Sequence, residues 1–230
     1  MGNFLPLRHR IAKKILKALD IKVATGPDML PARIFKMCAD QLSLPIVLLA
    51  RLAISTGQWP EIWRLRWVIP LFKKGARHDP SKYRGVHLTT VISKAVERLL
   101  GSVLVPFLER VTARDLLALL TTTWLWKFER GSKIGAFLSD ISGAFDRVPS
   151  GRLVKKLLRA GVSATVANFF VSYLSERLAG VAVGGVFSEF TALANMVFQG
   201  TVLGPPLWNV FFADVAKAVN KNGFCESVFA

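Results

Sequence analysis

Short apolar runs of strand length alternate with helix-length segments along this 230-residue chain. This alternation restricts the fold, because strands that are separated by helices pack against those helices in a mixed domain. We therefore predict an α/β (α+β) fold. The strand-like runs are residues 67–72, 134–138, 178–186, 196–198 and 224–230.

Several helix-length segments carry apolar residues on one face and cations on the other. Residues 8–19 have this pattern, with Ile11, Ile15, Leu16 and Leu19 on one face. Residues 151–160 have it too, and Gly161 is placed to end that helix. The residues that we expect to face inward there are Leu153, Val154, Leu157 and Leu158. Two further helices are predicted to begin at Pro31 and at Val91, the second after a Thr90 cap. The remaining predicted helices cover residues 46–55, 116–128, 162–177 and 205–220.

Positive charge limits the partners that such a domain can have. The chain holds 31 Lys and Arg against 15 Asp and Glu, a formal charge of +16. Residues 1–110 hold 19 of these cations and 7 of these acids. An excess of this size favours a polyanionic partner, and nucleic acid more than an anionic membrane surface. The plain alternative is a solvated basic face that keeps the protein soluble.

Two features bear on the compartment and the membrane. Two cysteines, Cys38 and Cys225, are too few for a disulfide framework, which favours a reducing, intracellular compartment. The longest uncharged stretch, residues 190–213, is long enough to cross a bilayer. It also contains Gln, Asn, Gly and Pro residues, whose polar groups are costly in lipid when unpaired. We expect a buried core segment and no membrane partner.

Asp140 is the first candidate for chemistry. It follows the apolar run 134–138, so an extended chain there would place its carboxylate at the rim of the core. Carboxylate oxygens suit Mg²⁺, which also keeps waters and substrate phosphates as ligands. The alternative is a loop aspartate that caps the next turn. Phe145, five residues on, could wall a substrate pocket or simply belong to the core.

Two loops are candidates for contacts with a nucleotide. In residues 199–206, Gly200 and Gly204 allow positive φ or close backbone approach, and Gln199 offers both a donor and an acceptor. An ordinary turn between a strand and a helix would look the same. Lys73, Lys74 and Arg84 flank a polar turn, where flexible cations could close over a triphosphate. A solvated basic loop is the alternative there.

The order of seven motifs adds a resemblance to these local patterns. The series resembles the reverse transcriptase domain of non-LTR retrotransposons over residues 10–230. The motifs are TGPDxxP at 25–31, GQWPxxW at 57–63, PxxKKG at 70–75, DPxxYR at 79–84, SKxxER at 93–98, DxxxAFDxV at 140–148 and QGxVLGP at 199–205.

The resemblance implies a right-hand polymerase, with fingers at residues 1–133 and a palm at 134–230. It implies that Asp140 binds the catalytic metal and that the carbonyl of Ile141 is a second contact. It implies that Phe145 is the sugar gate, an aromatic ring that disfavours ribonucleotides. Nucleotide contacts are further implied for Gln199, Gly200 and Arg84, and for Lys73 or Lys74.

The implied reaction is template-directed addition of a deoxynucleotide to a 3′-OH. The partners would be an RNA template, a DNA primer and a dNTP, with two Mg²⁺ ions about 4 Å apart. Nuclear localisation is implied by the family.

The sequence also departs from the family pattern. It stops at Ala230, where relatives continue into a strand with a pair of metal-binding aspartates, and it has no thumb. We therefore expect an incomplete palm and an inactive chain. The alternatives are a non-catalytic nucleic-acid-binding fragment and a retroelement relic.

Overall fold

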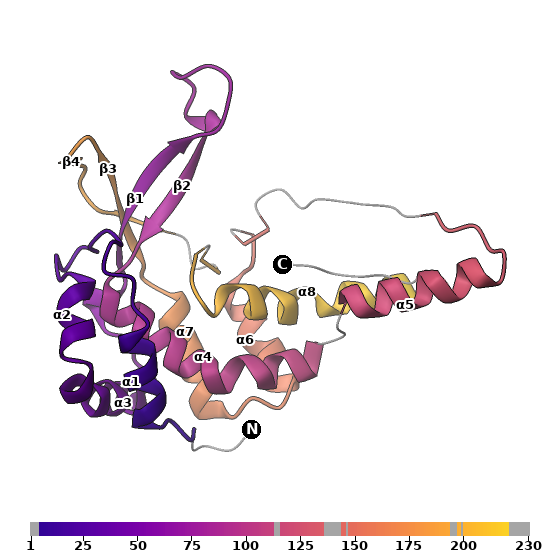
Figure 1. The fold of residues 1–230 in the computed structure, drawn as a ribbon, viewed down its shortest axis with the longest axis horizontal. Helices are drawn as coiled ribbons and strands as arrows, with labels where there is room; N and C mark the ends of the chain where they lie inside the picture. Colours follow the sequence, from indigo (N-terminus) through magenta and orange to yellow (C-terminus); the bar gives the residue numbers. More distant parts are fainter. Residues whose placement is uncertain are drawn as a thin grey trace.

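The computed structural model describes residues 5–112, 116–135, 144–145, 147–193, 197–198 and 200–220. Apart from the helix Leu116–Glu129, which extends to one side, its helices form one group, from which a long β-hairpin projects (Figure 1). The α-helices are α1 His9–Lys17, α2 Ala32–Met37, α3 Ala39–Thr56, α4 Val91–Thr112, α5 Leu116–Glu129, α6 Ser150–Arg159, α7 Ala164–Leu174 and α8 Gly204–Asn220. The strands are β1 Leu65–Phe72, β2 Tyr83–Leu88, β3 Leu178–Val183, β4 Val186–Phe187 and β5 Thr191–Ala192. The mixed α/β class is confirmed.

One sheet joins segments that lie far apart in the sequence. Its order is β2-β1-β3-β4, and β5 also pairs with β3. Strands β1 and β2 are antiparallel, whereas β1 and β3 are parallel. Residues before and after position 134 therefore share a sheet. The fingers and palm boundaries stay a prediction.

The parallel pair depends on a glycine. Gly180 is the register partner of Trp67, and a Cβ at position 180 would lie 2.3 Å from the indole ring. The ring can cover the strand only because no side chain stands there. Trp67 then stacks on Phe190, with ring centroids 4.5 Å apart, and packs against Phe187 at 4.6 Å.

The hydrophobic core lies between the helices and one end of the sheet. Trp59 is fully buried there and packs edge-on against Trp63, at 4.9 Å, and against Tyr173 of α7, at 5.2 Å. Its backbone N–H donates to the hydroxyl of Ser172, 2.9 Å away. Helix α3 is long and apolar enough to cross a membrane, yet it packs against α1, α4 and α7. The core segment expected within residues 190–213 is confirmed only in part. Residues 190–192 and Gly200 are exposed, whereas the buried residues are Val197, Phe198, Leu203, Leu207, Trp208 and Val210.

Most helix ends follow the sequence pattern. Thr90 caps α4 as expected, since its hydroxyl accepts from the N–H of Ser93 at 3.2 Å. Gly161 has φ +86° just after α6. Gly57 ends α3 with φ +66°.

Other boundaries differ from the predictions. Helix α3 begins at Ala39 rather than at 46, because the helix accommodates Pro45. Helix α7 ends at Leu174, before Glu176 takes φ +52°. Leu158 is exposed, so its predicted inward orientation is wrong. Two of the predicted strands are not strands where the structure describes them: this holds for Ile134 and Gly135 and for the buried pair 197–198. The other predicted strand residues lie outside the described residues, namely 136–138, Met196 and 224–230.

Gly180→Val should destabilise the fold by about 1–3 kcal/mol, because the new side chain overlaps Trp67 in a packed layer. Urea unfolding measures the change. Gly151→Ala is the matched control, since Gly151 has no neighbour within 4 Å of a new Cβ and lies in the first turn of α6. An unchanged unfolding free energy for Gly180→Val would contradict the packing described.

Candidate functional site

The β1–β2 hairpin places two of the predicted nucleotide contacts on one face. Its register pairs Leu71 with Arg84 and Phe72 with Tyr83. The N–H of Lys73 donates to the carbonyl of Lys82 at 2.8 Å, which continues the ladder by one residue. Since directly opposite and alternate residues share a face, Lys73 and Arg84 lie on the same side of the hairpin.

The end of this hairpin is strongly cationic. Lys73, Lys74 and Arg84 are exposed, and in the described part of the chain they form no ion pair. Asp79 is the single acid of the connection; hydrogen bonds from Ser81, and then its contact with Lys82, lower the pKa of its carboxyl. Exposed cations without acidic partners can bind phosphate oxygens.

The loop after residue 196 is a tight turn leading into α8. Gly200 has φ +83°, a conformation that side chains rarely adopt. The hydroxyl of Thr201 donates to the carbonyl of Phe198 at 2.8 Å. A Cβ at Gly204 would lie 2.8 Å from that same carbonyl oxygen, so both glycines are required by the turn.

Phe145 is half-buried and packs against the core. Its ring lies 6.3 Å from that of Trp208, one turn into α8. This contact brings the segment that follows Asp140 against the helix that follows Gln199. The contact fits the core alternative, and a role as sugar gate stays a prediction.

The structure brings some predicted residues together and leaves others apart. Lys73 joins Arg84 on the hairpin, and Phe145 joins the start of α8. The hairpin end extends away from α8 (Figure 1). Asp140, Ile141 and Gln199 lie outside the described residues. Within the described ranges, no three His, Cys, Asp or Glu side chains gather as a metal site would require.

Sequence reasoning missed a buried polar cluster beneath the loop. Glu97 of α4 is 2% exposed, and its Oε2 accepts from the N–H of Val202 at 3.0 Å. Arg66 of β1 and Arg177 are also buried, with guanidinium carbons 4.1 and 5.0 Å from the ring centroid of Phe198. One sequence signal could have found this cluster. Glu97 lies three and seven residues before Leu100 and Leu104, so it falls on the apolar face of the helix, where a charged side chain is expected to be buried.

The charges of this cluster are shifted by burial. Burial raises the pKa of the Glu97 carboxyl, although Arg177 and the N–H of Val202 oppose the change. Burial, and then Arg177, lower the pKa of Arg66 to about 9, so Arg66 stays protonated at neutral pH. Glu97 is thus near enough to both buried guanidinium groups for their charges to act on its pKa, although the guanidinium nitrogens of Arg66 have no hydrogen-bond partner in the described part of the chain.

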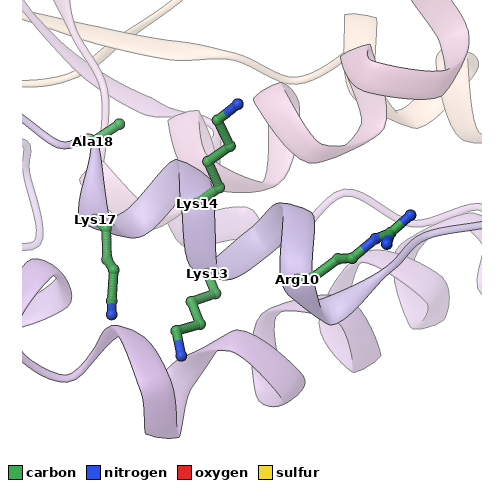
Figure 2. A pocket seen from close by; sticks show the side chains of 5 residues that line it. All are labelled: Arg10, Lys13, Lys14, Lys17 and Ala18. Carbon is green, nitrogen blue, oxygen red and sulfur yellow. The ribbon is translucent and has the colours of Figure 1, made fainter.

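A second basic surface lies on α1, whose side chains Arg10, Lys13, Lys14 and Lys17 line a shallow pocket (Figure 2). Lys13 and Lys17 point to the same side and pair with Asp40 of α3, Lys17 at 3.6 Å. Arg10 and Lys14 point elsewhere, and no described acid lies within ion-pair distance of them. The apolar face of the helix is used by the core, where Ala12 and Leu16 are buried.

Comparison with known proteins identifies relatives of this chain. The sequence model of the family described as "Reverse transcriptase (RNA-dependent DNA polymerase)" matches residues 72–230. The RNA-directed DNA polymerase from mobile element jockey of Drosophila melanogaster is 29% identical over 88% of this chain and 24% of the relative. Its counterpart from Drosophila funebris is 26% identical over a match that covers 96% of this chain and 26% of the relative. The probable RNA-directed DNA polymerase from transposon BS of Drosophila melanogaster is 26% identical over a match that covers 91% of this chain and 25% of the relative. The chain thus spans about a quarter of the length of these relatives.

Gly200→Ala should cost about 1–2 kcal/mol of unfolding free energy, because alanine disfavours the left-handed backbone of the turn. Gly200→Asn should cost less, since asparagine tolerates this region better. Chemical denaturation of both variants tests the difference. Equal stability of the alanine variant and the original chain would contradict the turn geometry.

Proposed function

Since the chain belongs to the reverse transcriptase (RNA-dependent DNA polymerase) family, we propose that it forms part of an enzyme that copies RNA into DNA. The resemblance to non-LTR retrotransposon enzymes is confirmed by the relatives. In the proposed reaction, an RNA template directs the addition of a dNTP to the 3′-OH of a DNA primer. Nuclear localisation remains part of this proposal.

The observation that carries the proposal is the cationic end of the β1–β2 hairpin. Lys73 and Arg84 share one face, are exposed and lie within the matched residues. Cations held at the end of a rigid ladder can bind the triphosphate of an incoming nucleotide. Lys74 would add a third positive charge at the same end. The Gly200 turn would present Gln199 to the nucleotide or template.

Metal binding would fall to Asp140 and the carbonyl of Ile141. Both donors are hard oxygens, which suit Mg²⁺. Two bound Mg²⁺ ions would supply activation of the attacking 3′-OH and neutralisation of the phosphate charge. Phe145 would restrict the space beside the sugar. The fingers would be residues 1–133 and the palm 134–230, and the β1–β3 pair would attach the hairpin to the palm.

A non-catalytic nucleic-acid-binding protein is the second candidate function. It is favoured by α1, where Arg10 and Lys14 are exposed on a helix whose apolar face is already buried. Such a helix has no apolar face left to insert into a membrane, so its charge suits a phosphate backbone instead.

Replacing Lys73, Lys74 and Arg84 together by Gln should weaken Mg²⁺–dNTP binding by about tenfold or more, because charge-assisted contacts are lost. The matched control replaces Arg10 and Lys14 by Gln. Fluorescence titration with a labelled dNTP, in the presence of template–primer, measures both variants. Equal losses in the two variants would contradict a nucleotide site on the hairpin and favour the second function.

Residues 1–230 alone should give no product in primer extension with Mg²⁺ or Mn²⁺. They supply Asp140 but not the aspartate pair that the family resemblance implies. Loss of one preorganised electrostatic group costs about 10²–10³ in rate, and two are missing here. Template-dependent product that is abolished by Asp140→Asn would contradict this expectation.

A further inference from the structure

The turn at Gly200 is anchored on both sides. On one side, Phe198 is 3% exposed, and its ring covers the guanidinium of Arg66 at 4.1 Å. On the other, the N–H of Val202 donates to the carboxylate of Glu97 at 3.0 Å. The two anchors lie four residues apart and belong to one buried cluster.

Glu97 is itself held in a rigid setting. Arg177, the nearby counter-charge, donates from Nε and Nη2 to the carbonyl of Tyr173 at 3.0 and 2.6 Å. Arg177 also lies 4.6 Å from the ring centroid of Tyr173. Tyr173 is fully buried in α7, where burial and then the nearby Glu97 raise the pKa of its hydroxyl. The carboxylate therefore has fixed neighbours on α7 as well as on the loop.

We propose that Glu97 is a positioning residue that fixes the backbone of residues 200–202, so that Gly200 meets the nucleotide or template in one conformation. The functional part of this proposal rests on the proposed reverse transcriptase activity. The structural part rests on the hydrogen bond to Val202 and on the burial of Phe198 over Arg66.

A purely electrostatic role is the competing explanation. In that case Glu97 would only balance the buried charges of Arg66 and Arg177. The two roles separate on Glu97→Gln, because glutamine keeps an oxygen that can accept from Val202 but loses the charge. Positioning predicts that Gln rescues most of what Ala loses, whereas charge balance predicts that Gln fails like Ala.

Hydrogen exchange of the 230-residue chain tests the proposal. In Glu97→Ala, amides of residues 200–204 should exchange about ten- to a hundredfold faster, as expected for loss of a hydrogen bond to a charged acceptor. Amides of α1 and α3 should keep their rates. Arg98→Gln is the matched control, because it removes a charge from the adjacent, exposed position of α4.

Equal acceleration throughout the chain, no acceleration in residues 200–204, or a Gln variant as fast as Ala would each overturn the proposal. The same samples with template–primer, Mg²⁺ and dNTP provide a second readout. Protection of residues 200–204 in the original chain and in Gln, lost in Ala, would support the functional part. Local acceleration without any ligand-dependent protection in the original chain would support the structural role of Glu97 and count against the proposed function.

Discussion

The arrangement of this protein depends on three charged side chains buried between the sheet and the helices. Arg66 comes from β1, Arg177 lies just before β3, and Glu97 lies on α4. Each would be costly to bury alone, so each restricts where the others can lie. Phe198 covers both guanidinium groups, which brings the loop before α8 onto the same cluster.

This cluster explains how two distant parts of the sequence form one unit. Parallel pairing of β1 with β3 aligns Arg66 with Ala179, so Arg66 and Arg177 point to the same face of the sheet. The other face is covered by Trp67 over Gly180. One end of β1 is thereby fixed in the core, while its other end continues into the exposed hairpin. A rigid base with a cationic end suits a part that contacts phosphates.

Much of the local structure could be predicted from the sequence, and the long-range contacts could not. The Thr90 cap, the turn between Lys73 and Arg84 and the conformation of Gly200 follow from residue type and spacing. The parallel β1–β3 pair could not be predicted, because alternation of apolar and polar residues indicates a strand but does not identify the strand that pairs with it. Glu97 was missed as a site residue because charged side chains are rarely buried. Its role depends on Val202, which lies 105 residues away along the chain.

The central claim is that Phe198 and Arg66 join the loop to the sheet through direct contact. A double-mutant cycle of Phe198→Leu and Arg66→Met, followed by urea unfolding, measures that contact. A buried cation–aromatic contact predicts a coupling free energy of about 1–2 kcal/mol. Effects that add to within about 0.5 kcal/mol would show that the two side chains do not interact, and would contradict the account.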